Sequence, residues 1–310
     1  MLRLLASLLF LTLLNAHAEL VERQKVMMGT FVSIAVDMQH KELIAPAFNL
    51  LQTIESSLSS FDKNSPIYKL NHDKSAKLDR YSYEALKLSL DYYKETDGYF
   101  DIAVGKITKD LYCFGLDERV ASSKSLKQAS TAISGLLFNQ DEAIITDTIK
   151  IDLGGMGKGY GVDKLRAYLK ANDVKYAVIA LSGDIRCIGE CPVAVNDPLR
   201  EGAILATFQM KNSGVSTSGN YNRYVKDVAH NHLINPKNKS SEKNFISVTL
   251  IAKLPSATLD AYATAVSVMP IKRAYAFLDA HQLAYIVLQS NRALRVSKNI
   301  QEYVKDLKLK

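Results

Sequence analysis

Asp260 and Thr264 stand four positions apart in a segment that is otherwise mostly apolar. A helix would therefore place a carboxylate and a hydroxyl on one face. Both groups are oxygen ligands of the kind that Mg²⁺ prefers, and Mg²⁺ in proteins commonly bridges the phosphates of a substrate. The same pair also occurs on solvent-facing helices, so the spacing alone leaves a plain exposed helix as the alternative.

A glycine-rich segment, residues 151–161, carries five of the 15 glycines within eight positions. Glycine leaves backbone N–H and C=O groups accessible, and a helix N-terminus offers unpaired N–H donors to an anion. A phosphate ligand would suit this segment. Lys158 is not followed by Ser or Thr, however, and no Gly-x-Gly-x-x-Gly is present, so neither standard nucleotide loop fits. A glycine-rich bend without a ligand remains the alternative.

His230 and His232 lie two positions apart, and an extended segment would point both rings the same way. No third ligand at a suitable spacing accompanies them, which disfavours zinc. A single His beside a phosphate loop could instead accept the proton of an attacking hydroxyl, while a structural His is the alternative for either residue. The hydroxyl-rich segment 216–219 is compatible with phosphate contacts. It contains no Gly-x-Ser-x-Gly, so an α/β-hydrolase has no support.

Hydrophobic periodicity predicts the elements that would position these residues. We expect strands over 26–37, 176–181, 204–210, 245–252 and 284–289, a strand or short hairpin over 143–151, and helices over 42–58, 83–96, 162–170, 258–269 and 271–280. Residues 59–71 and 214–236 are rich in turn and polar residues and are expected to be loops, the second one a binding loop. Because strands and helices do not alternate regularly, we predict an α+β fold rather than a doubly wound sheet.

Composition is that of a globular protein: of 310 residues, 47% are hydrophobic and 23% charged. The formal net charge is +7, and it becomes +6 without residues 1–18, which contain one Arg and no acid. This mild excess would help attract a polyanionic small molecule. The basic residues form no stripe interleaved with aromatics, so nucleic-acid binding is not expected.

The N-terminus has the pattern of an export signal. Arg3 precedes a mostly apolar run, 4–14, and Ala16-His17-Ala18 is a small-x-small cleavage site. We expect residues 1–18 to be a signal peptide and 19–310 a single domain, exported to the periplasm. The apolar run is too short to span a bilayer, so no stable membrane anchor is expected, although a retained N-terminal anchor is the alternative.

Three cysteines, Cys113, Cys187 and Cys191, are present. In an oxidising compartment Cys187 and Cys191 could close a tight local loop. Connectivity does not follow from sequence, so small buried thiols are an equal alternative.

Taken together, these segments resemble the ApbE family of FAD:protein FMN transferases. The resemblance covers nearly all of residues 19–310, and its landmarks follow the family's order. They are Met28-Gly29-Thr30, Ser60 to Asn71, Thr96 to Gly105, Asp152 to Tyr160 with Asp163, Leu181-Ser182-Gly183-Asp184, Ser216 to Tyr221, His232 to Pro236, and Asp260 to Thr264. The chain departs from the family at Ser182, where Gly is frequent, and at Asn235, where Asp is frequent; the second change removes a carboxylate near the expected base.

The resemblance implies a T-fold-like α+β architecture with FAD in a cleft between two lobes and Mg²⁺ at its diphosphate. The metal ligands implied are the Gly155 carbonyl and the side chains of Asp260 and Thr264. Contacts to the flavin nucleotide would fall on Met28, Pro66, Ile67, Tyr68, Asp101, Lys158 and Ile234.

The reaction implied is attack by a Ser or Thr hydroxyl of an exported flavoprotein on the FMN-side phosphorus of FAD, with release of AMP. His232 is the hypothetical base, and the acceptor would carry a Ser/Thr-Gly-Ala-Ser/Thr motif, which this chain does not contain. Two alternatives remain: a Mg²⁺-dependent FAD pyrophosphatase, in which water is the acceptor, and a periplasmic flavin-binding protein without turnover.

Overall fold

A computed structural model describes residues 20–221 and 223–310. The predicted signal peptide, residues 1–18, lies outside the described residues. Within the described part of the chain, no helix is both long enough and apolar enough to cross a membrane.

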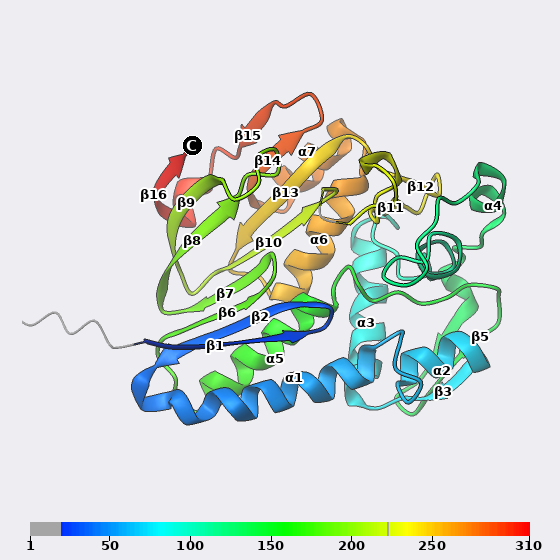
Figure 1. The fold of residues 1–310 in the computed structure, drawn as a ribbon, viewed down its shortest axis with the longest axis horizontal. Helices are drawn as coiled ribbons and strands as arrows, with labels where there is room; N and C mark the ends of the chain where they lie inside the picture. Colours follow the sequence, from blue (N-terminus) through cyan, green and yellow to red (C-terminus); the bar gives the residue numbers. More distant parts are fainter. Residues whose placement is uncertain (1–19, 222) are drawn as a thin grey trace, which may run out of the picture.

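The centre of the fold is an eight-stranded, fully antiparallel sheet (Figure 1). In sheet order its strands are β1 (Leu20–Met27), β2 (Thr30–Asp37), β6 (Ala177–Leu181), β7 (Asp184–Ile188), β10 (Gly214–Gly219), β13 (Phe245–Ala252), β14 (Ala284–Gln289) and β15 (Leu294–Val296). The pairings of β2 with β6 and of β7 with β10 join segments far apart in sequence. This strand order therefore brings loops from distant parts of the sequence close to one another.

Helices pack on the sheet through two hydrophobic cores. They are α1 (Ile44–Leu58), α3 (Arg80–Glu95), α5 (Gly157–Ala171), α6 (Ser256–Val268) and α7 (Ile271–Ala280). One core joins α1 and α5 to β1, β2 and β6, and the other joins α3, α6 and α7 to β13. Helix α6 is buried on nearly every side, which explains why it is apolar all round rather than amphipathic.

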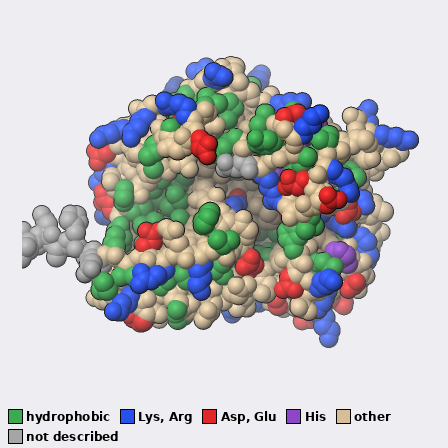
Figure 2. Space-filling model, in the orientation of Figure 1, with side chains coloured by type: hydrophobic (Ala, Val, Ile, Leu, Met, Phe, Trp, Pro, Cys, Tyr) green, Lys and Arg blue, Asp and Glu red, His purple; other side chains and the backbone are tan. Residues whose placement is uncertain are grey.

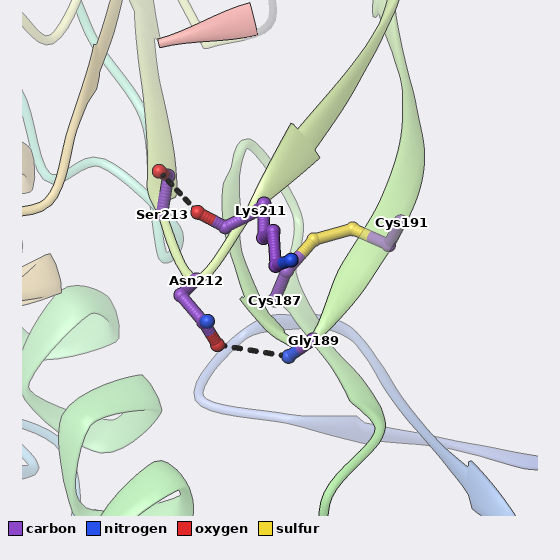
Figure 3. Close-up of a disulfide and its surroundings, with 6 residues drawn as sticks. All are labelled: Cys187, Gly189, Cys191, Lys211, Asn212 and Ser213. Atoms are coloured by element: carbon purple, nitrogen blue, oxygen red, sulfur yellow. Dashed lines mark hydrogen bonds between the residues drawn. A yellow bond between two sulfur atoms is a disulfide. The ribbon is translucent and has the colours of Figure 1, made fainter.

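A smaller sheet packs against the main one through a third core. Its strands are β8 (Glu190–Asn196), β9 (Ile204–Lys211) and β16 (Val304–Leu309), in the order β16-β9-β8. A disulfide joins Cys187 on β7 to Cys191 on β8, close to where Gly189 N donates to Asn212 Oδ1 (2.9 Å) (Figure 3). The Cys187–Cys191 alternative is therefore the one found, and Cys113 is a free, half-buried thiol.

A second lobe lies to one side of the main sheet, on the right in Figure 1. It contains α2 (Pro66–Asp73), α4 (Ser123–Gln128), the sheet of β3 (Ser75–Lys77), β5 (Glu142–Ile145) and β4 (Leu136–Phe138), and the pair β11 (Ile234–Asn235) and β12 (Ser240–Ser241). Short 3-10 or π segments are η1 (Met38–Leu43), η2 (Lys106–Leu111), η3 (Ile133–Gly135), η4 (Val228–His230) and η5 (Ile300–Glu302). The face seen in Figure 2 is hollowed between this lobe and the main sheet.

The predicted helices correspond to α1, α3, α5, α6 and α7 and the predicted strands to β2, β5, β6, β9, β13 and β14. The strand expected over 143–151 was too long, because β5 ends at Ile145. The predicted α+β class is confirmed. Two predicted loops were wrong in part. The first, 59–71, contains the start of α2, because Ser65 caps the helix at Ile67 N and Pro66 takes its first position. The second, 214–236, begins with β10, which pairs with β7 and β13 despite its Gly, Ser and Thr residues.

Removing the disulfide by the double substitution Cys187→Ala and Cys191→Ala is expected to lower the free energy of unfolding by about 2 kcal/mol. Closing so short a loop restricts the unfolded chain only modestly. Urea unfolding of the oxidised protein and of the variant measures the difference. An unchanged midpoint would show that the bond contributes nothing to stability.

Candidate active site

The site is built where the N-terminus of α5 meets α6. Gly159, in the first turn of α5, lies against the α6 backbone so closely that a Cβ there would stand 2.2 Å from Ser256 O. Its N–H donates to Asp260 Oδ2 on α6 (3.1 Å). Glycine is therefore required at this position because the two helices approach to backbone contact, which brings the Asp260 carboxylate to the helix N-terminus.

Asp163 completes a reciprocal arrangement between the same two helices. Its carboxylate, on α5, accepts hydrogen bonds from Ser256 N (2.8 Å) and Ala257 N (2.9 Å), at the start of α6. The buried guanidinium of Arg186 lies 3.7 Å from that carboxylate and also donates to Ser256 Oγ (3.1 Å) and to Leu254 O. Each helix thus caps the other, which fixes the position of α6 and of the predicted ligands Asp260 and Thr264.

The three predicted metal ligands lie together. Thr264 Oγ1 donates to Gly155 O (3.2 Å), and a Cβ on Gly155 would stand 3.1 Å from the Thr264 methyl. Asp260 lies one turn earlier on α6, with 2% of its surface exposed. The glycine-rich bend is therefore not an isolated turn, and the Asp260–Thr264 pair is not on a solvent-facing helix.

Lys158 occupies the centre of the cluster. Its Nζ lies 3.2 Å from Asp184 Oδ2 and 3.2 Å from Asp260 Oδ2. Although burial works against the charged form, these two carboxylates raise the pKa of Lys158 above its ordinary value. Asp184 is almost fully buried and accepts a hydrogen bond from Ser216 Oγ (2.6 Å). Burial, reinforced by the charge of Asp260, raises the pKa of Asp184.

The donor set fits a hard divalent cation. A carboxylate, a hydroxyl and a backbone carbonyl are all oxygen ligands, and such a partial set leaves coordination positions for water and phosphate, as Mg²⁺ requires. Among the described residues, no three His, Cys, Asp or Glu side chains gather as a metal-binding group. The carbonyl of Gly155 and the hydroxyl of Thr264 would therefore be needed as ligands alongside Asp260.

His232 lies in the segment just before β11. Its Nδ1 is 3.1 Å from the carbonyl oxygen of Arg223. Because a carbonyl only accepts, Nδ1 carries the proton and Nε2 holds the lone pair in the neutral ring. Burial lowers the pKa of His232 to about 4, and the positive charges of Arg223 and Lys158 act in the same direction. The ring is therefore neutral near pH 7. His230 faces Tyr112 whereas His232 faces Phe114, so the two rings have different neighbours.

The other predicted nucleotide contacts have different surroundings. Met28 lies over the start of α5, where its sulfur would be 3.4 Å from a Cβ on Gly161. Asp101 is 9% exposed, its carboxylate accepts from Ala103 N (2.7 Å), and burial raises its pKa to about 7. Tyr68 stacks on His72 with ring centroids 3.8 Å apart.

Three predicted contacts are less available to a ligand at this centre. Ile67 is fully buried in the core, and Ile234 is 6% exposed within a separate apolar cluster. Pro66 lines a surface cavity of about 350 Å³ together with Asn64 and Lys69. Contacts from Ile67 would have to come from its backbone. The roles of these three residues, like those of Met28, Tyr68 and Asp101, remain predictions.

Sequence reasoning assigned no role to Asp163, Asp184 or Arg186. Asp163 and Asp184 both stood within recognised landmarks, which was the available signal. Arg186 offered no such signal. It stands between two predicted strands, 176–181 and 204–210, and an Arg in a connection is ordinarily exposed.

Comparison with known proteins decides the family. A family model described as the ApbE family matches residues 28–287. The chain belongs to the ApbE family. All the predicted metal ligands and Lys158 lie within the matched range.

Curated ApbE relatives are similar over most of their length. The FAD:protein FMN transferase of Vibrio cholerae is 26% identical over 308 residues, which cover 92% of each chain. That of Escherichia coli is 26% identical over 289 residues, covering 84% of this chain and 82% of the relative.

Solved ApbE structures have the same fold. The ApbE protein of Thermotoga maritima is 26% identical with a TM-score of 0.85, covering 93% of this chain and all (100%) of the other. The flavin transferase ApbE of Vibrio cholerae is 22% identical with a TM-score of 0.80, covering 92% and 99%. The expected ApbE architecture is therefore confirmed.

Proposed function

We propose that this chain is an FAD:protein FMN transferase, which moves FMN from FAD to a Ser or Thr hydroxyl of an exported flavoprotein and releases AMP. The single observation that carries the proposal is the cluster of Gly155, Lys158, Asp260 and Thr264 at the N-terminus of α5. It combines hard-cation ligands and a lysine ammonium beside the N-terminus of a helix, which suits a diphosphate.

Gly155, Asp260 and Thr264 would hold Mg²⁺, which supplies neutralisation of the charge that develops on the diphosphate. Lys158 adds a second positive charge. In the reaction, the acceptor oxygen bonds to the FMN-side phosphorus and the bond from that phosphorus to the bridging oxygen breaks. The bridging oxygen leaves with AMP, and the acceptor's proton goes to Nε2 of His232. Positioning and electrostatic stabilisation account for most of such a rate enhancement.

Met28, Pro66, Ile67, Tyr68, Asp101 and Ile234 would contact the rest of the flavin nucleotide. The acceptor would carry a Ser/Thr-Gly-Ala-Ser/Thr motif, and the reaction would take place in the periplasm after removal of residues 1–18. The export pattern of the sequence supports this location.

The test is a mass-spectrometric assay of the purified 19–310 protein with FAD and Mg²⁺, with and without a peptide that carries the acceptor motif. A transferase adds FMN to the peptide and releases an equal amount of AMP. The same metal ligands would also serve an attacking water, so AMP and free FMN at equal rates with and without peptide would replace the proposal by a pyrophosphatase. Intact FAD in both arms would indicate a flavin-binding protein.

Substituting His232→Ala is expected to reduce the transfer rate by about 10²- to 10⁴-fold, the usual contribution of a positioned base. The Michaelis constant for FAD should change little, because the ring acts on the acceptor. His230→Ala is the matched control, since its ring faces Tyr112 instead, and it should retain wild-type transfer. Steady-state rates at saturating FAD and Mg²⁺ measure both. A full transfer rate in His232→Ala would exclude it as the base.

A further inference from the structure

The ammonium of Lys158 already pairs with Asp260, the carboxylate proposed to bind a metal ion. Lys158 Nζ is within 3.3 Å of both carboxylate oxygens of Asp260, and it also reaches Asp184. Both carboxylates are nearly buried, with 2% and 3% of their side-chain surface exposed. The ammonium therefore neutralises, from within the chain, part of the negative charge that would otherwise attract a metal ion.

The net charge of Lys158, Asp184 and Asp260 together depends on which ligands are bound. With both carboxyl groups ionised, Asp184, Asp260 and the ammonium of Lys158 sum to −1. A divalent cation alone would change this to +1, whereas a cation together with a doubly charged diphosphate returns it to −1. Without the ammonium, a divalent cation alone would bring the sum to zero. Because uncompensated charge is costly in a buried site, a divalent cation alone neutralises less charge when the ammonium is present, and the diphosphate offsets the positive charge that the metal adds.

Asp184 gives the ammonium of Lys158 a second carboxylate partner. Its carboxylate is held by Ser216 Oγ (2.6 Å) on the neighbouring strand β10, so it does not depend on Lys158 for its place. When Asp260 turns to a metal ion, Lys158 can keep its contact with Asp184 and turn its remaining N–H groups to the diphosphate. An ammonium has three donors, which permits both contacts at once.

We propose that Lys158 acts as an internal cation that makes divalent-metal binding depend on the dinucleotide, an inference that rests on the proposed function of this same site. The metal and FAD then bind synergistically, and each raises the affinity for the other by the same factor. Asp184 is a positioning residue that holds the displaced lysine. Metal bound without substrate is a minor state of this protein.

Mn²⁺ binding tests the inference without reference to turnover. Free Mn²⁺ is measured by electron paramagnetic resonance with the wild-type protein alone, with FAD and with inorganic pyrophosphate. We expect FAD to lower the dissociation constant for Mn²⁺ at least tenfold, after correction for Mn²⁺ bound by FAD in solution. Equal affinity with and without FAD would overturn the inference, and this arm needs no variant.

Lys158→Met provides the second arm, with Lys164→Met as the matched control. Lys164 lies on the same helix and pairs with Glu84, away from the cluster. Lys158→Met should bind Mn²⁺ alone at least tenfold more tightly than the wild type, and FAD should improve that affinity much less. Mg²⁺ without FAD should also raise the melting temperature of Lys158→Met, because it replaces the missing partner of two buried carboxylates. Lys164→Met should match the wild type in both measurements.

The outcomes separate this inference from the proposed function. If Mn²⁺ binds the wild type with FAD but Lys158→Met binds Mn²⁺ alone no more tightly than the wild type, the internal-cation role is wrong and the metal site stands. If no arm binds Mn²⁺, both the inference and the proposed metal site fail. FMN transfer to the acceptor peptide, measured separately, would in that case have to proceed without a divalent ion.

Discussion

Substituting Asp260→Asn is expected to reduce FMN transfer about 10³-fold while the protein remains folded. The change removes the only carboxylate among the proposed metal ligands, and the loss of several kcal/mol of transition-state stabilisation corresponds to a factor of this size. The fold should persist, because the amide oxygen of Asn can still accept from Gly159 N. Steady-state transfer rates over a range of Mg²⁺ concentrations, with circular dichroism for the fold, measure both effects.

Asp279→Asn is the control for this experiment. Asp279 is an exposed acid on the neighbouring helix α7, so its substitution removes the same charge outside the site. It should leave both the rate and the Mg²⁺ dependence unchanged. A folded Asp260→Asn protein with wild-type transfer at every Mg²⁺ concentration would contradict the proposed metal site.

Substituting Gly159→Ala is expected to lower the free energy of unfolding by about 3 kcal/mol or more. The added methyl would stand 2.2 Å from Ser256 O and 2.8 Å from Ala257 N, both backbone atoms that cannot rotate away. Overpacking of a close-packed interior commonly costs up to about 3 kcal/mol, and here a whole helix must shift. Because α6 carries Asp260 and Thr264, FMN transfer should fall as well. Urea unfolding and transfer assays measure the two effects.

Gly157→Ala, two positions earlier, is the matched control. A Cβ at Gly157 would meet only Met28 Cε, at the ordinary contact distance of 3.9 Å. In a helix, Ala is favoured over Gly by about 1 kcal/mol, so this variant should be as stable as the wild type or more stable. If both glycine variants lost stability equally, the close approach of α5 and α6 at Gly159 would not be the cause.

The elements predicted best from sequence are those with strong periodicity. Helix α7 and strands β13 and β14 have the bounds that the pattern gave. Strand β1 escaped prediction because only Val21 and Met27 of its eight residues are buried, so it shows no alternation. Strand β10 escaped because its sequence is Gly- and Ser-rich, and its partners β7 and β13 come from distant segments. A local sequence pattern cannot show which distant strands pair with one another.

The residues of the site likewise fall into those that sequence could predict and those that it could not. The metal ligands Gly155, Asp260 and Thr264 were predicted from the resemblance to the ApbE family, because the spacing of Asp260 and Thr264 alone left an exposed helix as the alternative. The contacts of Lys158 with Asp184, and of Asp163 with Arg186, depend on how α5, α6 and β7 pack. Such contacts join residues that no spacing rule connects, so they became visible only in the folded chain.

The most direct test is anomalous diffraction from crystals of this protein grown with FAD and Mn²⁺. We expect a single strong peak about 2.1 Å from oxygens of Gly155, Asp260 and Thr264, with the FAD diphosphate bound to the same ion. A well-ordered diphosphate away from the N-terminus of α5, or Mn²⁺ bound elsewhere with Asp260 still paired to Lys158, would contradict it.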